Sequence, residues 1–441
     1  MSASTIQQAY RAQTSGARPP VRIVHLGLGA FHRAHQAWYT ARAADAADWG
    51  IHAFTGRSRE LADQLAAQDG LYTLVTRDAA ADRMSIVDSI VRVGTAAEPR
   101  AFAVAVADRE TSVVSLTITE AAYGLTASGD LDAATLADID GLRRRVAPST
   151  ALGRLAAGIM LRRAAHGRPL TVLSCDNIPS NGLVLGRALG AVVEAVDPAA
   201  MAWLAENVTF PSSSVDRITP HTDAAESGRI ERLAGWIDAA PVVTEPFSDW
   251  VIGGDFAAGR PAWETAGARF VADVEPWERR KLWLLNGAHT ILAAVGLRRG
   301  YTTVAEAVAD AAVLAIVEGF WDEASRHLPG LQIERYRAEL LQRFANPRIA
   351  HRLVQIDEHS ETKARLRLVP VALAERAAGR SAEGTARAIA GWVAGHRDSG
   401  TSDPATLLRG LSPELAADAT FRHLVEAHVA DPTRILNGAS A

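Results

Sequence analysis

One segment near the amino terminus limits the folds that this chain can adopt. The mostly apolar run Val21–Leu26 leads directly into Gly27-Leu-Gly29. An apolar run of this length that ends in glycines is typical of a buried strand entering a tight turn, and the sequence from Ala30 to about Ala46 predicts a helix after it. This order of strand, turn and helix indicates a parallel sheet with crossover helices.

The alternation continues along the first part of the chain. Further buried strands are predicted over residues 51–55, 112–118 and 170–174, with helices through Leu61 and Leu65, around 150–165 and around 180–197. From about Pro276 onward, Ala, Leu, Arg and Glu with helical spacing replace the strand pattern. We therefore predict an α/β Rossmann-like N-terminal domain over residues 1–272 and a mostly α-helical C-terminal domain over residues 273–441.

The glycine turn has the residue types that a dinucleotide's pyrophosphate requires. Gly27 and Gly29 let the backbone approach the phosphates, and the helix start at Ala30 and Phe31 supplies unpaired N–H groups. His32 stands where the usual fingerprint has its third glycine, so a tight turn without a ligand is the alternative. The position after the first strand favours cofactor binding.

The end of the second strand normally separates NAD from NADP. An acidic side chain there accepts hydrogen bonds from the ribose hydroxyls, whereas arginine suits a 2′-phosphate. The segment here runs from Thr55 through Gly56, Arg57, Ser58 and Arg59 to Glu60. The two arginines and Ser58 could hold a phosphate, but Glu60 and the arginines could equally be exposed helix-start residues without a ligand, so this segment leaves the cofactor preference open. We expect NAD, with NADP as the alternative.

A helix predicted after residue 276 combines an apolar body with a polar side. Pro276 marks its start and Gly296 its end. At about 100° per residue, His289 and Asn286 lie roughly 80° and 140° from Lys281. Because unpaired polar groups are costly in a core, three of them on a mostly buried helix indicate either a satisfied network or a functional site.

These residue types together suit hydride transfer from a secondary alcohol. Lys281 is a candidate base, because burial and the positive nicotinamide of the oxidised cofactor would lower its pKa toward neutrality. Asn286 can donate to the developing alkoxide, and His289 can orient a substrate hydroxyl. Glu278, one turn before Lys281, is either a proton relay to solvent or a first-turn carboxylate that the helix dipole stabilises.

Several motifs follow one another along nearly the whole chain. They are residues 23–35 (IVHLGLGAFHRAH), 68–73 (QDGLYT), 117–120 (TITE), 174–182 (SCDNIPSNG), 210–220 (FPSSSVDRITP) and 245–247 (EPF), followed by the helix with Lys281, Asn286 and His289. In this order they resemble the long-chain mannitol dehydrogenase family, which also contains fructuronate (D-mannonate) and tagaturonate reductases and arabinitol dehydrogenases.

The resemblance implies a metal-independent dehydrogenase with a substrate cleft between the two domains. It implies that Lys281 is the general base and that Asn177 with Asn286 forms the oxyanion hole. It further implies that His289 and Lys363 bind substrate and that Asp216 lies in a loop on the nucleotide side. The implied substrate is a linear polyol or hexonate, with D-mannitol/D-fructose and D-mannonate/D-fructuronate both open. A mannitol 1-phosphate or arabinitol dehydrogenase, and a non-catalytic nucleotide sensor, are the alternatives.

Two departures from the family pattern bear on the substrate. Residues 357–363 read DEHSETK where the family has Asp-Gly-Ser-x-Lys, so the spacing before Lys363 has changed. Gln355 stands at about the place where mannitol dehydrogenases tend to carry an arginine, which makes this region more similar to fructuronate reductases.

Composition excludes several other classes of protein. A formal charge of −4 and a pI near 6.4 argue against nucleic-acid binding, and no apolar run reaches transmembrane length. The single Cys175 fits a reducing cytosol, so we expect a cytoplasmic protein that is a monomer or a weak oligomer. His25, His32 and His35 lack a carboxylate or cysteine at ligand spacing, so no metal site is expected.

Overall fold

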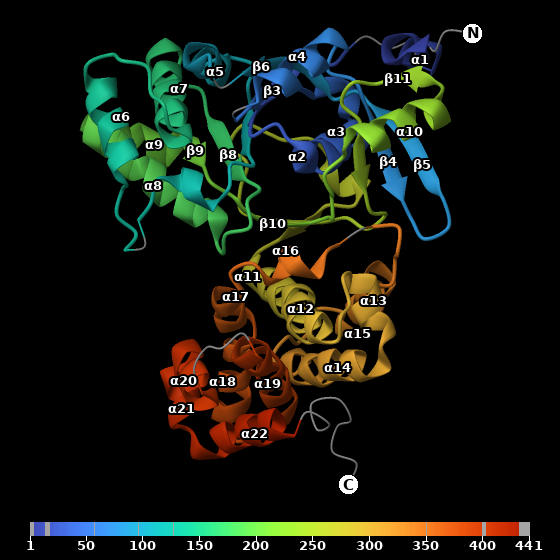
Figure 1. Ribbon diagram of the computed structural model, residues 1–441. Helices are drawn as coiled ribbons and strands as arrows, with labels where there is room; N and C mark the ends of the chain where they lie inside the picture. Colours follow the sequence, from blue (N-terminus) through green and yellow to red (C-terminus); the bar gives the residue numbers. More distant parts are fainter. Residues whose placement is uncertain are drawn as a thin grey trace. The chain divides into compact units, whose positions relative to one another are not determined.

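The computed structural model describes residues 4–13, 18–56, 58–95, 97–126, 128–349, 351–398 and 403–431. Its contacts divide the chain into two compact units, Met1–Glu275 and Pro276–Ala441, drawn in blue to yellow and in yellow to red in Figure 1. The sequence placed a domain boundary three residues earlier, between residues 272 and 273. Each unit is described by itself below.

The first unit is built on a six-stranded parallel sheet with the order β6-β3-β2-β7-β8-β9. The strands are β2 (Val21–Leu26), β3 (Gly50–Thr55), β6 (Ile90–Thr95), β7 (Val113–Leu116), β8 (Leu170–Ser174) and β9 (Val208–Thr209). Four of them confirm strands that the apolar runs predicted. The predicted Rossmann-like fold of this unit is confirmed.

Both faces of the sheet are buried, which explains why its strands read as continuous apolar runs. Ile23 and Val24 point to opposite faces and are 2 % and 0 % exposed. The core on the Ile23 side includes side chains of α3 (Gln36–Arg42) and α4 (Arg59–Ala67). The core on the Val24 side receives side chains from α5 (Pro99–Val106), α7 (Ala151–Ala165) and α8 (Asn181–Val196), which Figure 1 shows along one side of the sheet.

The helix predicted from Ala30 to about Ala46 is wrong as a single element. It is α2 (Ala30–Ala34) and α3, separated at His35, whose φ of −120° and ψ of −90° leave the helical region. The break places the His35 ring in the core. There its Nε2 lies 3.1 Å from the carbonyl oxygen of Asp249 and its ring meets the edge of Trp250. The tertiary contacts of the buried His35 ring thus interrupt a helix that local propensity alone would favour.

Three smaller sheets complete the first unit. β4 (Tyr72–Arg77) pairs with β5 (Asp82–Val87) and β12 (Val242–Thr244), while β13 (Asp249–Gly253) pairs with β10 (Ser212–Asp216) and β14 (Arg269–Val271). β1 (Ser4–Thr5) pairs with β11 (Trp236–Ile237). These sheets come from segments that the sequence analysis left without an assigned element.

The second unit is mostly helical, as predicted. Its centre is α12 (Ala288–Arg298), in which every residue from 288 to 296 is buried. The helices that pack around α12 are α13 (Val304–Ala309), α14 (Ala311–Ser325), α16 (Leu353–Asp357) and α19 (Glu383–Asp398). A helix that is apolar on all sides requires such a complete shell of neighbours.

The predicted helix end at Gly296 is wrong. α12 continues to Arg298, and Gly300, with a φ of +82°, follows the helix. Gly296 lies inside the helix because its neighbours leave no room for a side chain. A Cβ atom there would lie 2.9 Å from Leu353 Cδ1 and 3.0 Å from Ala307 Cβ. The glycine therefore permits close packing of helices and does not end the helix.

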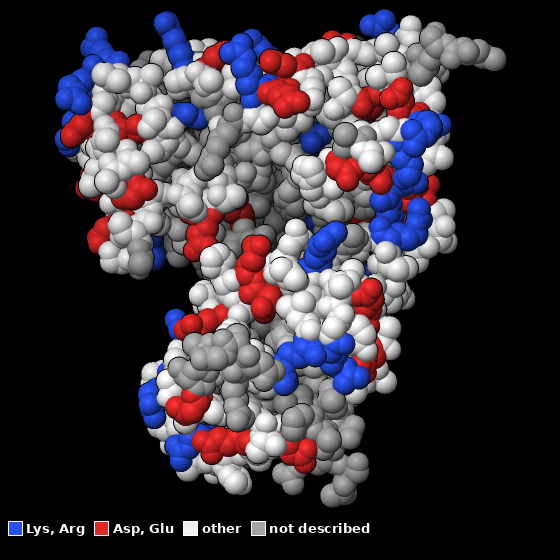
Figure 2. Space-filling view, viewed as in Figure 1, with Lys and Arg blue, Asp and Glu red and all other residues white. Residues whose placement is uncertain are grey.

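Charge and hydropathy of the described residues show no membrane-spanning element. No helix among them combines the length and the apolar character that crossing a bilayer requires. Figure 2 shows acidic and basic side chains mixed over the visible face of each unit.

Candidate active site

A cavity of about 490 Å³ lies in the first unit at the carboxyl ends of its central strands. Gly27 follows β2, Gly56 follows β3 and Thr117 follows β7, and all three residues line the cavity. The strand order reverses between β2 and β7, because β2 leads to β3 and β6 on one side and β7 leads to β8 and β9 on the other. Open α/β sheets bind their ligands at this kind of switch point.

Gly27 is required by the shape of the turn that forms one wall of the cavity. Its φ is +110°, and a Cβ atom there would lie 2.0 Å from the carbonyl oxygen of Thr117. The N–H groups of Gly27 and Leu28 both donate to the carbonyl oxygen of Phe54 at 2.9 Å, and the Thr117 hydroxyl donates to the Gly27 carbonyl at 2.9 Å. The turn is therefore fixed from both neighbouring strands.

The other described residues predicted on this turn follow Gly27 and Leu28 in the chain and are not among the residues that line the cavity. Gly29 is the N-cap of α2 and has an extended backbone, and a Cβ atom there would lie 3.6 Å from the Gly27 carbonyl oxygen. Ala30 and Phe31 form the first turn of α2 and are half-buried. Arg57 lies outside the described residues. At the end of β3 the structure shows Ser58 capping α4 through Leu61 N–H and the exposed pair Arg59–Asp63 at 3.8 Å.

Two buried histidines lie directly beneath the turn. The rings of His25 and His32 are stacked, with centroids 3.3 Å apart. The Thr117 hydroxyl donates to the Gly27 carbonyl, so in its 3.1 Å contact with His25 Nε2 the hydroxyl oxygen must accept. The His25 proton is therefore on Nε2, and Nδ1 accepts from the Ser115 hydroxyl at 2.9 Å. Burial lowers the pKa of His25 to about 3, which keeps the ring neutral. The described residues contain no group of three or more His, Cys, Asp or Glu side chains arranged to hold a metal ion.

Asn177 lies in the turn between β8 and α8, at the same carboxyl edge of the sheet, and is exposed. Hydrogen bonds of the neighbouring residues Asp176 and Asn181 hold this turn in place. Asp176 accepts from Thr119 N–H and from the Tyr123 hydroxyl, both at 2.9 Å, and Asn181 donates to the Asp176 carbonyl at 2.8 Å. The turn therefore presents Asn177 from a rigid support.

Asp216 occupies a different place from the one expected. It is the last residue of strand β10, 7 % exposed and opposite Asp249 of β13, so the assignment to a loop is wrong. Among the described residues, those lining the cavity at the switch point do not include Asp216. Residues 212–216 read SSSVD and have no apolar-polar alternation, so periodicity gives no signal for this strand.

The second unit holds Lys281 and Asn286 on an unusual helix. Between α11 (Glu275–Arg280) and α12, residues Lys281–Gly287 form a π-helix. The assumed 100° per residue is therefore wrong for this segment. In a π-helix residue i bonds to i+5, so Asn286 lies closer to the side of Lys281 than the predicted 140°. π-helical segments are frequent at functional sites.

The expected burial is only partly observed on this segment. Trp283, Leu284 and Leu285 are buried, whereas Lys281, Asn286 and the relay candidate Glu278 on α11 are half-buried. No described residue bonds the side-chain amide of Asn286. The main-chain carbonyl of Asn286 accepts from the Thr290 hydroxyl and from Arg367. The amide is therefore available to a ligand.

His289, in the first turn of α12, is 7 % exposed, and its Nε2 has no hydrogen-bond partner among the described residues. Its ring lies 4.9 Å from that of Phe344 and 4.6 Å from that of His351. Burial, followed by the charges of His351 and nearby arginines, lowers the pKa of His289 far below its usual value. A neutral, buried ring with one open nitrogen can bond a hydroxyl without gaining charge.

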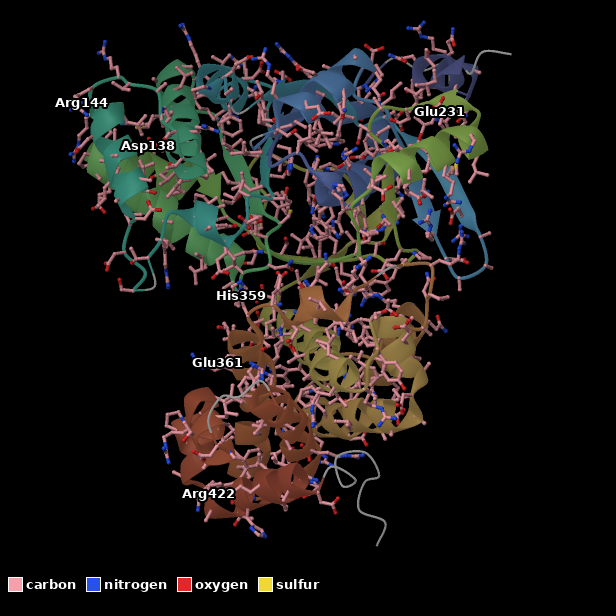
Figure 3. The ribbon with its side chains drawn as sticks, viewed as in Figure 1. Asp138, Arg144, Glu231, His359, Glu361 and Arg422 are labelled. Atoms are coloured by element: carbon pink, nitrogen blue, oxygen red, sulfur yellow. The ribbon has the colours of Figure 1, made fainter. Side chains whose placement is uncertain are left out.

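Further basic side chains surround His289, and sequence reasoning identified only one of them. Lys363 of α17 (Ser360–Arg367) donates to the Ile356 carbonyl at 2.8 Å, and burial lowers its pKa. Arg367, one turn further, donates to the Asn286 carbonyl at 3.2 Å and to Thr290 Oγ1 at 3.0 Å. Figure 3 labels His359 and Glu361 at the start of α17. The spacing of Lys363 and Arg367, one helical turn apart, is the signal that could have predicted Arg367.

Both units match models of one protein family. The model described as the mannitol dehydrogenase Rossmann domain matches residues 21–265, and that of the mannitol dehydrogenase C-terminal domain matches residues 273–426. The chain belongs to the mannitol dehydrogenase family. The predicted resemblance to this family is confirmed.

Several named dehydrogenases and oxidoreductases are similar to the chain over most of its length. D-mannonate oxidoreductase of Escherichia coli strain K12 is 37 % identical over 84 % of this chain and 79 % of its own. A ternary complex of Pseudomonas fluorescens mannitol 2-dehydrogenase with NAD and D-mannitol has a TM-score of 0.78 at 32 % identity, covering 95 % of this chain and 94 % of its own. Substrate-free D-sorbitol dehydrogenase has a TM-score of 0.85 at 27 % identity, covering 99 % and 98 %.

Proposed function

We propose that the chain is an NAD(P)-dependent oxidoreductase that interconverts a secondary alcohol of a linear hexonate or polyol with the corresponding ketone. The cavity at the switch point supports the cofactor part of this proposal, because it lies at the carboxyl ends of β2, β3 and β7 and is lined by Gly27 and Gly56. Gly27, Gly29, Ala30 and Phe31 are the proposed contacts to the pyrophosphate. NAD is the proposed cofactor, as in the ternary complex of the Pseudomonas relative.

The chain's use of lysine carries the catalytic part of the proposal. Of its 46 basic residues only two, Lys281 and Lys363, are lysines, and the other 44 are arginines. Arginine cannot be deprotonated in a protein, whereas a lysine in a partly desolvated site can act as a base. Lys281, on the π-helix, is thus one of the two basic side chains of the chain that could serve as a base in the proposed reaction.

The chain's own groups then have distinct roles. Lys281 would take the hydroxyl proton of the substrate and return it in the reverse reaction, and a bound nicotinamide would supply the hydride acceptor. Asn286 and Asn177 donate hydrogen bonds to the oxygen that becomes the ketone. His289 bonds a neighbouring substrate hydroxyl, and Glu278 exchanges the proton of Lys281 with solvent.

Arg367 favours a hexonate over a neutral polyol. The described residues provide no acidic partner for its guanidinium, and burial lowers its pKa to about 10. A half-buried cation that is bonded only to a carbonyl and a hydroxyl is poorly compensated, and a substrate carboxylate would compensate it in a bidentate pair. Lys363 adds a second positive charge nearby. We therefore propose D-mannonate/D-fructuronate ahead of D-mannitol/D-fructose.

A reduction screen tests the proposal. Fructuronate, tagaturonate, fructose and xylulose are each assayed with NADH and with NADPH, and fructuronate is expected to give the highest kcat/KM. The substitution Arg367→Met removes the positive charge. It should lower kcat/KM for fructuronate about 10- to 100-fold more than for fructose, because only fructuronate loses a charge-assisted pair between its carboxylate and Arg367.

The matched control for Arg367→Met is Arg365→Met on the same helix. Arg365 is exposed, and it pairs with Glu361 at 2.6 Å and with the Gly410 carbonyl at 3.0 Å. The control should leave the ratio of the two substrates unchanged. Equal losses on fructuronate and fructose in Arg367→Met would contradict the hexonate assignment, and no turnover of any ketone with either cofactor would contradict the proposed reaction.

A further inference from the structure

Arg154, in the first turn of α7, lines the cavity at the switch point together with the glycine turn. The charged residues that line this cavity are Arg154 and Asp132. The Asp132 carboxylate is already used, because it caps α6 (Ala133–Arg143) by accepting from Thr135 N–H at 2.7 Å. Arg154 is therefore the basic side chain that lines the cavity, and the carboxylate that lines it with Arg154 bonds a helix N-terminus.

A nearby carboxylate does not pair with Arg154. Asp138 of α6, labelled in Figure 3, accepts from the N–H groups of Ser149 and Thr150 and from both of their hydroxyls at 2.6–3.1 Å. Those bonds use both oxygens of Asp138 to fix the turn before α7. Asp138 acts on Arg154 only through its charge, since no ion pair or side-chain hydrogen bond joins Arg154 to any described residue.

The guanidinium of Arg154 is also partly desolvated. Its Nε is buried and has no acceptor among the described residues. Burial lowers the pKa of Arg154, and the charge of Asp138 offsets this only in part. A cation that is removed from water without an acceptor is unfavourable unless a ligand supplies one.

We infer that Arg154 binds a phosphate of the dinucleotide in this cavity. The inference rests on the proposed function, because it requires that a dinucleotide occupies the switch point. Guanidinium and phosphate match in charge and in the geometry of their donors and acceptors. The cavity reaches from Gly27, where a pyrophosphate would lie, to Gly56 at the end of β3, where the adenosine ribose would lie. The phosphate is therefore the pyrophosphate of either cofactor or the 2′-phosphate of NADP.

Equilibrium binding tests this role without depending on turnover. NADH and NADPH are titrated against wild type, Arg154→Met and Arg154→Lys by nicotinamide fluorescence, with adenosine as a phosphate-free competitor. Arg144, an exposed arginine of the same unit that is labelled in Figure 3, provides the matched control Arg144→Met. Thermal unfolding of each variant verifies that it is folded.

Arg154→Met should raise the Kd of at least one dinucleotide about 10- to 100-fold and leave adenosine binding unchanged, and Arg154→Lys should recover part of the loss. A loss with both NADH and NADPH assigns Arg154 to the pyrophosphate, and a loss confined to NADPH assigns it to the 2′-phosphate. Unchanged binding of both, or an equal loss for adenosine, overturns the inference. If wild type binds neither dinucleotide, the proposed function itself fails.

Discussion

Gly27 and Gly29 are two residues apart on the same turn, but their backbones differ. Gly27 has a φ of +110°, and a side chain there would overlap the backbone of Thr117. Gly29 has an extended backbone, and a Cβ atom there would meet only the Gly27 carbonyl oxygen at 3.6 Å, an ordinary contact. The first glycine is thus required by the fold, whereas the second leaves space on the side where the ligand is proposed.

Alanine at each position should separate these two roles. Gly27→Ala should lower the free energy of unfolding by about 2 kcal/mol or more, because it combines a positive φ with a backbone clash. Gly29→Ala should change it by less than about 1 kcal/mol but weaken NADH binding, because a methyl group would fill the approach to the phosphates. Urea unfolding and NADH titration measure the two effects, and equal stability of the two variants would contradict this account.

Some residues of the site were within reach of sequence reasoning and others were not. The position of Gly27 directly after a predicted strand made its role in a turn evident before the structure was known. His351 and Arg367 are on segments 62 and 78 residues beyond His289, and no periodicity within one helix brings such residues together. Their proximity to His289 follows from tertiary packing of several helices.

The π-helix Lys281–Gly287 is the element on which the site of the second unit depends. Widening a helix leaves carbonyl groups displaced from their usual partners, and these need other donors. Trp321 of α14 donates its Nε1–H to the Leu284 carbonyl at 2.8 Å, and Arg367 and Thr290 bond the Asn286 carbonyl. Side chains from neighbouring helices thus stabilise the local geometry that places Lys281 and Asn286.

A pair of tryptophan substitutions tests this support. Trp321→Phe should lower the free energy of unfolding by about 0.5–1.5 kcal/mol more than Trp392→Phe, because it removes the Trp321 bond to the buried Leu284 carbonyl and leaves that carbonyl only the Ala288 N–H. Both indoles are buried, and Trp392 Nε1 has no partner among the described residues, so the control changes volume but loses no hydrogen bond. Urea unfolding followed by circular dichroism measures the difference, and equal losses would show that the Trp321 bond does not stabilise the segment.

At the scale of elements, apolar patterns predicted the parallel strands well, since β2 and β8 have the predicted bounds. They could not predict the π-helix, because its residues are as apolar as those of an ordinary buried helix and only its hydrogen bonding differs. They also missed the break at His35, because the bond from His35 to Asp249 joins residues far apart in the sequence.

At the scale of the whole molecule, the two units contribute different parts of the proposed site. The parallel sheet of the first unit provides a cavity at its switch point, and the helical unit provides the two lysines of the chain. The change from strand-helix alternation to a helical pattern near Pro276 was sufficient to predict two units, and the order of motifs was sufficient to predict the family. The proposed hexonate substrate rests on the charges around His289, and the motifs alone left the substrate open.

The central claim is that Lys281 transfers the proton of the reaction, and replacing each lysine by arginine tests it most directly. Lys281→Arg and Lys363→Arg both keep the positive charge, but arginine cannot act as a base at neutral pH. The measurement is kcat for ketone reduction at neutral pH, with the Kd of NADH determined in parallel. The account predicts that Lys281→Arg lowers kcat about 10²- to 10⁴-fold with an unchanged Kd, while Lys363→Arg retains most of kcat. Full turnover by Lys281→Arg would contradict it.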